Sequence, residues 1–228
     1  MKKYIGEPVC LDLFGKKELI GTLVDFGSDI LVLLSQNDFY YIPLFHIRAI
    51  RSLSVEEAGS LSQSNSSMTL SFDEQLSLKE VLQAAAKGIF VKVNVTPSHS
   101  IHGYITHVLD NYLVLFSPVY KTIFIPIHHI KFLIPYPEGF LPYGIDITKS
   151  AVSATHPHLA AFEDQLAKLQ DSFITVNIEE KESVSGLLLG KEAGFIELQT
   201  VNGQQVHMNI QHIKTVLPSE YKKEKYRG

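Results

Sequence analysis

The sequence contains a single cysteine, Cys10, among 228 residues. One thiol cannot form an intramolecular disulfide or a zinc site built from several cysteines, and a lone thiol fits a reducing compartment. Free cysteine is among the residue types most often buried, and no partner base accompanies this one. We therefore interpret Cys10 as a small core residue.

Long apolar runs are also missing from the sequence. No stretch approaches the roughly 20 apolar residues that a transmembrane helix needs. Lys2 and Lys3 begin the chain, and Gly6, Glu7 and Pro8 interrupt any apolar core that a secretory signal peptide would require. We expect a soluble protein, made in the cytoplasm without a signal peptide and without a membrane partner.

The common catalytic and cofactor-binding motifs are absent as well, including Gly-x-Ser-x-Gly, Walker-type loops and dinucleotide fingerprints. Ten histidines suggest a metal site, but no carboxylate completes the cluster of His99, His102 and His107. His128 and His129 are adjacent, and neighbouring strand residues point to opposite faces. We predict a protein that is not an enzyme, with no catalytic residue, no cofactor and no metal.

The charge lacks the dense basic footprint that gives nucleic-acid binders their affinity. The formal net charge is -4. Residues 1–53 carry six basic and six acidic side chains, residues 77–135 carry five and two, and residues 158–218 carry four and eight. RNA is thus a possible partner that the charge does not favour.

Three segments of the chain repeat one pattern: a strand of alternating apolar residues, a glycine, and a closing histidine. The glycine follows the end of the strand at one spacing, from position 13 to 21, 95 to 103 and 178 to 186. Such agreement indicates an internal repeat. The landmarks are the strands 9–13, 91–95 and 174–178, the glycines Gly21, Gly103 and Gly186, and the histidines His46, His129 and His212.

Each repeat is predicted to be a small β-barrel. Val91, Lys92 and Val93 show the period of two that marks a half-buried strand. Polar breaks containing glycine predict hairpin turns, so each repeat has about five short strands. The repeated glycines are structural and predict a bend or bulge. A bent five-stranded sheet that curls on itself forms a small barrel.

The predicted fold is mainly β with short helices. Apolar residues at helical spacing predict helices over Glu74–Lys87 and His158–Asp171, before the second and third repeats, whereas the first repeat lacks a full helix. Tyr136, Phe140 and Tyr143 suggest that the second linker packs on a domain surface. The predicted organisation is repeat 1 at 1–53, a Ser-rich linker at 54–73, repeat 2 at 74–135, a Pro, Gly and aromatic linker at 136–157, repeat 3 at 158–218, and a basic tail at 219–228.

Two sets of repeat-equivalent polar residues are candidate binding or structural positions. A small polar residue inside a strand can contact a ligand, or it can bond to the backbone of a neighbouring turn. The closing histidine is interpreted as one structural residue per repeat. The two sets are Asp12, Asn94 and Asn177, and His46, His129 and His212.

The strand pattern resembles the Sm-like fold, with the bacterial Sm-like RNA chaperone as the comparison. The matching positions are Val9, Leu11, Leu13, Gly15, Leu19, Gly21, Phe26 and residues 30–34. The chaperone contacts RNA through a Lys-His pair, and its histidine matches the closing histidine of each repeat. The lysine is replaced by Phe45, His128 and Gln211. The resemblance implies three Sm-like barrels and speaks against RNA binding.

The ending Ile-Pro-(apolar)-(any)-His-Ile at positions 42–47 is similar to a family of uncharacterised Sm-like repeat proteins of endospore-forming bacteria. Some members are associated with the spore coat. The resemblance therefore implies a spore-associated protein with coat proteins among its partners. We expect a non-enzymatic structural or interaction scaffold, and an RNA-binding Sm-like protein is the alternative.

The same architecture raises the question of assembly. Open sheet edges leave backbone groups unpaired, and a neighbouring edge satisfies them. Three repeats paired in line would leave two edges, so that two chains would close a six-repeat ring as a homodimer. A compact monomer whose linkers cover the edges is the alternative.

Overall fold

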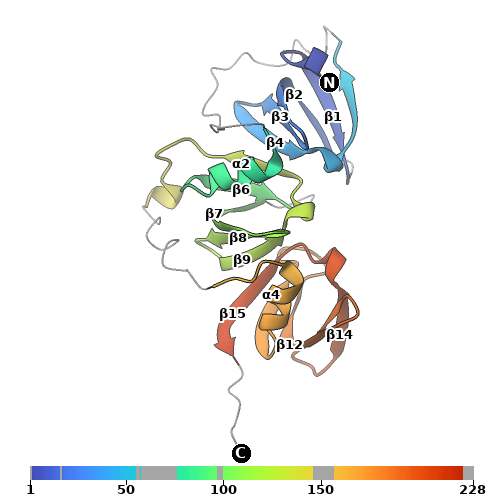
Figure 1. Cartoon of the computed structure of the whole chain (residues 1–228), viewed down its shortest axis with the longest axis vertical. Helices are drawn as coiled ribbons and strands as arrows, with labels where there is room; N and C mark the ends of the chain where they lie inside the picture. Colours follow the sequence, from blue (N-terminus) through green and yellow to red (C-terminus); the bar gives the residue numbers. More distant parts are fainter. Residues whose placement is uncertain are drawn as a thin grey trace, which may run out of the picture. The chain divides into compact units, whose positions relative to one another are not determined.

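A computed structural model describes residues 2–15, 17–54, 57, 76–96, 100–145 and 157–222 (Figure 1). The chain is mainly β, with its strands in antiparallel pairs. His99, most of the predicted Ser-rich linker, residues 146–156 of the second linker and residues 223–228 of the tail lie outside the described residues. Among the described helices, none is long and apolar enough to cross a membrane.

The chain divides into two compact units, Met1–Ile105 with Ile130–Thr148, and Thr106–His129 with Lys149–Gly228. This division passes through the predicted second repeat. The predicted repeat boundaries remain a prediction.

The first unit is built on an antiparallel sheet with the strand order β7-β6-β10-β4-β3-β2-β1-β5. Its strands are β1 (Pro8–Leu13), β2 (Lys17–Phe26), β3 (Ile30–Ser35), β4 (Asp38–Pro43), β5 (Ile47–Ser52), β6 (Phe90–Asn94), β7 (Ser100–Val108) and β10 (Phe132–Pro135), with helix α2 (Leu78–Ala85) and the 3-10 turns η1 (Lys2–Tyr4), η2 (Leu44–His46) and η4 (Pro142–Gly144).

The second unit has the strand order β14-β13-β12-β11-β15-β9-β8. Its elements are β8 (Tyr112–Ser117), β9 (Lys121–Pro126), η3 (Ile127–His129), α4 (Phe162–Lys168), β11 (Ser172–Val176), β12 (Val184–Glu192), β13 (Phe195–Gln199), β14 (Gln205–Asn209), η5 (Ile210–His212) and β15 (Val216–Lys222).

Two of the repeated glycines are required by the close approach of a neighbouring strand. A Cβ atom on Gly21 would lie 2.3 Å from the carbonyl oxygen of Leu34, and one on Gly186 would lie 2.6 Å from that of Gln199. No other residue type fits such a gap without movement of the backbone. All three glycines pair with equivalent residues: Val9 with Gly21, Val91 with Gly103, and Ile174 with Gly186.

The bulges lie further along the strands than the sequence suggested. The register of β2 against β3 shifts between Leu23 and Asp25, and that of β12 against β13 shifts between Leu188 and Gly190. An extra residue in one strand bends it locally. The bend therefore follows the close-packed glycine and does not coincide with it.

Both helices begin later than predicted, and a side chain from a distant turn accepts from the first N–H group of each; α2 also has a local cap, the Ser77 hydroxyl, which accepts from the N–H group of Glu80. The N–H group of Leu78, at the start of α2, donates to Oδ1 of Asp29 (2.7 Å). The N–H group of Phe162, at the start of α4, donates to Oδ1 of Asn111 (2.8 Å). These caps satisfy donors that a helix leaves unpaired. Residues 74 and 75 of the first predicted helix lie outside the described residues.

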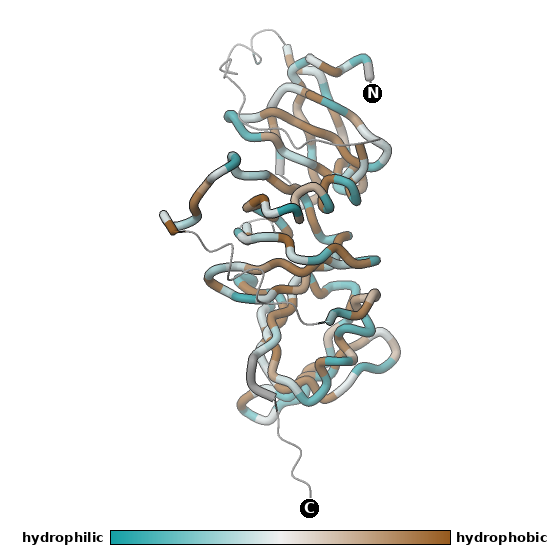
Figure 2. The backbone as a smooth tube through the Cα atoms, turned by 60° about the vertical axis from the view of Figure 1, so that its left-hand side comes forward, coloured by the Kyte–Doolittle hydropathy of each residue, from teal (hydrophilic) through white to brown (hydrophobic). Residues whose placement is uncertain are grey.

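Each unit has its own core of apolar side chains. The hydrophobic residues, coloured brown on the backbone tube in Figure 2, follow the strands. In the second unit, the buried Tyr112 hydroxyl donates to the carbonyl of Leu159 (2.6 Å), and burial raises the pKa of Tyr112 to about 12. Buried residues of the first core include Val9, Leu11, Leu13, Leu23, Leu31, Leu33, Ile42 and Phe132, and those of the second include Tyr112, Phe124, Phe162, Leu166, Ile174, Val176, Ile196, Leu198 and Val216.

Candidate functional site

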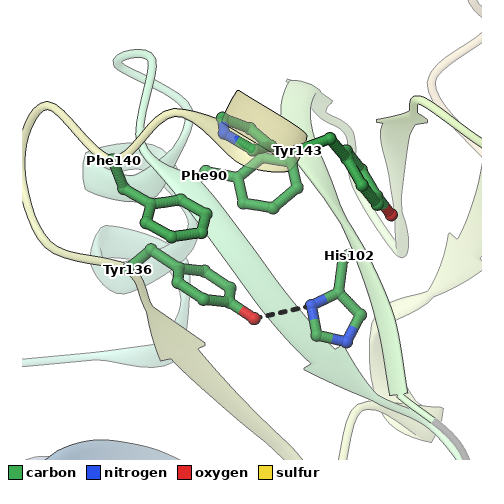
Figure 3. A pocket seen from close by; sticks show the side chains of 6 residues that line it. Phe90, His102, Tyr136, Phe140 and Tyr143 are labelled. Carbon is green, nitrogen blue, oxygen red and sulfur yellow. Dashed lines mark hydrogen bonds between the residues drawn. The ribbon is translucent and has the colours of Figure 1, made fainter. Parts of the chain in front are cut away.

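An aromatic pocket of about 250 Å³ opens on the first unit (Figure 3). Its size suits one side chain or one ring, since sites for drug-sized ligands begin at about 300 Å³. We call it the aromatic pocket. It is lined by Phe90, His102, Tyr136, Phe140, Pro142 and Tyr143.

Strand pairing places the two sides of the pocket together. β10 pairs with β6, and the N–H group of Tyr136 donates to the carbonyl of Phe90 (2.9 Å). The Phe140 ring stacks on the Tyr136 ring, with centroids 4.4 Å apart, and lies 5.9 Å from the Phe90 ring. This part of the second linker therefore packs on the sheet of the first unit, as its aromatic residues suggested.

The segment that carries Phe140 and Tyr143 exposes apolar side chains to solvent beside the pocket. Phe140 is 40% exposed, Leu141 55%, Tyr143 66% and Ile145 57%. We call residues 140–145 the apolar segment. Tyr143 has a φ of 56°, a left-handed conformation that costs a non-glycine residue roughly 1–2 kcal/mol. Exposed apolar side chains that gather beside a pocket indicate an interaction site.

Two polar groups of the pocket are paired with each other. The Tyr136 hydroxyl and Nδ1 of His102 form a hydrogen bond of 2.8 Å (Figure 3). Burial, with the carboxylate of Asp38 as a smaller cause, raises the pKa of Tyr136, so its phenol stays protonated at neutral pH. None of the six lining residues is a carboxylate, lysine or cysteine. The pocket thus offers ring contacts and one polar pair.

A lysine stands beside the pocket. Lys92 on β6 lies directly opposite His102 on β7, and directly paired strand residues project from the same face of a sheet. Lys92 is half-buried. Its ammonium group would disfavour a cationic ligand and would suit a ligand with a negative charge next to its ring.

The repeat-equivalent polar positions have a different partner in each repeat. Oδ1 of Asn177 accepts from the N–H group of Lys214 (2.7 Å), and its Nδ2 donates to the carbonyl of His212 (3.3 Å). These bonds to the backbone of a turn are the structural alternative that the sequence left open. Asp12 instead forms an ion pair with Arg48 (3.5 Å), and Nδ2 of Asn94 donates to Oγ of Ser100 (3.3 Å).

The closing histidines all end a 3-10 turn. The carbonyl of His46 accepts from the N–H group of Phe14 (2.9 Å), and Nε2 of His129 bonds to the carbonyl of Gln211 (3.0 Å). His212 is exposed and meets Asn177 through its own carbonyl. The hydrogen bonds of the three histidines thus differ: His46 and His212 accept through their carbonyls, and His129 bonds through its ring.

The prediction that His128 and His129 point to opposite faces of a strand is wrong. They lie in η3, where the chain has left the strand, and their rings are 4.1 Å apart. Of the cluster predicted around His102, that residue lines the aromatic pocket, whereas the ring of His107 packs against His158 at 4.8 Å. Across the described residues, no three metal-ligating side chains meet.

The sequence pattern did not identify three residues as members of a site: Phe90, Pro142 and Lys92. The signal available was the run of aromatic residues in the second linker, which indicated a packed surface. Nothing in the local pattern identified Phe90, at the edge of a predicted strand, as the residue on which that surface rests.

Comparison with known proteins gives a family. A model of the YwrJ third domain matches residues 161–216, inside the predicted third repeat. "Uncharacterized protein YwrJ" of Bacillus subtilis (strain 168) is 32% identical over 220 residues, which cover 95% of this chain and 97% of that protein. This chain belongs to the YwrJ family. Its relative comes from an endospore-forming bacterium, the group that the resemblance implied.

Proposed function

We propose that this YwrJ-family protein is a non-enzymatic interaction scaffold, which binds another protein through the aromatic pocket. The observation that carries the proposal is the apolar segment 140–145, with four large exposed side chains beside a pocket sized for one side chain. Aromatic anchors in a desolvated pocket are the usual centre of a protein interface. The hydrogen-bonded Tyr136–His102 pair would fix the orientation of the inserted side chain.

The scaffold is proposed to consist of three Sm-like barrels. Two features support this: each repeated glycine pairs with the same position of the preceding strand, and each repeat ends in a 3-10 turn with its histidine last. The host of the Bacillus relative supports a partner among spore-coat proteins, and so a place in the coat.

Affinity capture tests the binding site. The tagged chain and its Phe140→Ala/Tyr143→Ala variant would be used on extracts of sporulating and growing Bacillus cells, after nuclease treatment. We expect wild type to retain a defined set of proteins and the variant to lose them. Phe195→Ala is the matched control, since Phe195 is 42% exposed on β13 of the second unit. Retention of the same proteins by wild type and the double variant contradicts the proposal.

RNA binding is a second candidate, favoured by one observation. Lys92 lies beside the aromatic pocket, and an aromatic platform with a nearby cation is how proteins hold single-stranded nucleic acid. Against it, the lysine of the chaperone motif is missing before each closing histidine. We therefore expect binding to generic RNA no tighter than about 10⁻⁴ to 10⁻⁶ M at physiological salt, the non-specific range.

Titration of single-stranded RNA at two salt concentrations separates the candidates. Weak binding that Lys92→Ala and Tyr143→Ala leave unchanged supports the protein-binding scaffold. Binding at least about tenfold tighter than the non-specific range, with a steep salt dependence that Lys92→Ala reduces, would replace the scaffold with the RNA binder.

A further inference from the structure

Two strand junctions inside the chain follow one rule. In the first unit, β4 pairs antiparallel with β10, with Tyr41 opposite Leu133. In the second unit, β9 pairs antiparallel with β15, with Phe124 opposite Val216. Phe124 lies 83 positions after Tyr41, and Val216 lies 83 positions after Leu133. The same repeat positions therefore meet in both junctions.

Two described strands, β14 and β5, are equivalent to the strands of these junctions but have no such partner. Among the described strands, β14 pairs only with β13, and β5 pairs only with β1. Continuing the offset of 83 gives His207 on β14 as the equivalent of Phe124, and Ile50 on β5 as the equivalent of Leu133. The two unpartnered edges are therefore complementary halves of the junction that the chain forms twice.

The backbone of β14 has its outer hydrogen-bonding groups in the right place. The N–H group of Thr200 donates to the carbonyl of Gln204, and that of Ile210 donates to the carbonyl of Gly194. Bonded residues alternate along an antiparallel pair, so the N–H group of His207 points away from β13. Tyr41 and Phe124 occupy the same alternate position in their own strands.

The backbone of β5 also directs hydrogen-bonding groups outward at the position that would face His207. The N–H group of Leu53 donates to the carbonyl of Pro8 across β1 and β5. By the same alternation, Ile50 directs its backbone groups away from β1. Ile50 is half-buried, whereas its equivalents Leu133 and Val216 are fully buried under their partner strands. The β5 edge thus has the polar and apolar groups that a partner strand would cover.

We propose that the partner is a second copy of this chain, whose β14 pairs antiparallel with β5 and places His207 opposite Ile50. The complementarity of the two edges supports this occupant, because β14 and β5 are the equivalents of the strands that already pair with one another within the chain. Two such junctions in a closed pair leave neither edge unpaired. This self-association is independent of the aromatic pocket.

Light scattering of the full chain over a hundredfold concentration range is the first test. We expect a mass near twice 25.6 kDa. His207→Pro should weaken association at least about tenfold, because proline removes the outward N–H group but none that β13 uses. His207→Ala keeps that N–H group and should associate like wild type. Thermal melts of both variants show whether the third repeat stays folded.

Cysteine cross-linking is the second test, and it does not depend on the proline variant. In a Cys10→Ala background, His207→Cys and Ile50→Cys chains would be purified separately, mixed and oxidised. Paired residues in antiparallel strands lie about 5.5 Å apart at Cα, within reach of a disulfide. We expect a cross-linked dimer from the mixture, and less of it when the His207→Cys chain also carries Gln205→Pro, which removes another outward N–H group of β14.

Two results would overturn the proposal. A mass of one chain at every concentration, together with no cross-link in the mixture, shows that the edges do not pair. An oligomer that His207→Pro leaves intact, and in which the mixed cysteines do not cross-link, shows that the copies associate elsewhere. Loss of partner capture by the Phe140→Ala/Tyr143→Ala variant with normal dimerisation separates this proposal from the proposed function.

Discussion

Strands β9 and β14 hold equivalent places in the repeat but have opposite surroundings. Phe124 on β9 is 2% exposed in the core of the second unit, and β9 has β15 as its outer neighbour, whereas His207 on β14 is exposed and β14 has no outer neighbour among the described strands. The covered strand carries an aromatic residue and the open strand a polar one. Equivalent positions have thus diverged according to what covers them, and paired variants at covered and open positions can test this.

The largest difference is expected between Phe124→Ala and His207→Ala. Phe124 packs edge-on against Tyr112 with centroids 5.9 Å apart, and its removal leaves a cavity in the core of the second unit. We expect Phe124→Ala to lower the free energy of unfolding by about 3–5 kcal/mol and His207→Ala by less than about 0.5 kcal/mol. Urea denaturation measures both, and equal losses would contradict the comparison.

Asn177 and Asp12 form the next pair. Asn177 is buried and bonds to two backbone groups of a turn from a left-handed conformation, φ 55°. Asn177→Ala should cost about 2–3 kcal/mol, because two polar groups lose their partner and alanine tolerates that conformation poorly. Asp12→Ala removes only a surface ion pair and should cost at most about 1 kcal/mol. The midpoints of denaturant unfolding measure both losses of stability. A larger loss for Asp12→Ala than for Asn177→Ala would contradict the expectation that Asn177 has the more important structural role.

Two glycines of β12 differ in the space available for one added methyl group. A Cβ on Gly186 would meet the Gln199 carbonyl at 2.6 Å, whereas one on Gly190 would meet nothing within 4 Å. We expect Gly186→Ala to cost about 1–2 kcal/mol, since the strands must separate, and Gly190→Ala to stay within about 1 kcal/mol of wild type. Thermal melts provide the measurement. Identical melting temperatures would show that the backbone yields.

The smallest expected effect is the difference in the pH dependence of stability between variants of the buried Tyr112 and the exposed Tyr143. The folded-state pKa of Tyr112 is about 12, above the ordinary value of 10, so its contribution is complete below pH 10 and is lost between about pH 10 and 12. Tyr112→Phe should cost about 1 kcal/mol at pH 8 through the bond to Leu159.

The difference in stability between wild type and Tyr112→Phe should then shrink as the pH rises from about 10 toward 12. Tyr143→Phe is the control, because Tyr143 is 66% exposed. Denaturation at several pH values gives both curves. A constant difference across this range would show that Tyr112 ionises at its ordinary pKa in the folded protein.

Much of the strand pattern could be predicted from the sequence because it depends on neighbours along the chain. The alternation in Val91–Val95 predicted β6, which the structure places at Phe90–Asn94. The start of α2 has a local signal, because the Ser77 hydroxyl accepts from the N–H group of Glu80 in a Ser-x-x-Glu pattern. The start of α4 could not be predicted, since Asn111 caps it from about 50 residues earlier in the chain. Local spacing carries no information on such contacts.

The candidate site was less predictable for the same reason. Phe90 and Tyr136 meet because β6 pairs with β10, a choice made by the whole sheet. His128 and His129 were misjudged because the period of two was continued past the end of β9, although Pro126 ends the strand and a 3-10 turn follows. The repeat pattern identified equivalent residues, but it did not show which of them have different contacts in each repeat.

The caps on α2 and α4 have a consequence for synthesis. Asp29 leaves the ribosome well before Leu78, and Asn111 well before Phe162, so each acceptor can be in place when its helix emerges. Short helices of this length have little stability alone. Each finished hairpin therefore supplies the first turn of the next helix with a partner. A break in the chain between Asp29 and α2 would separate a cap from its helix, so these repeats should not behave as freely interchangeable pieces.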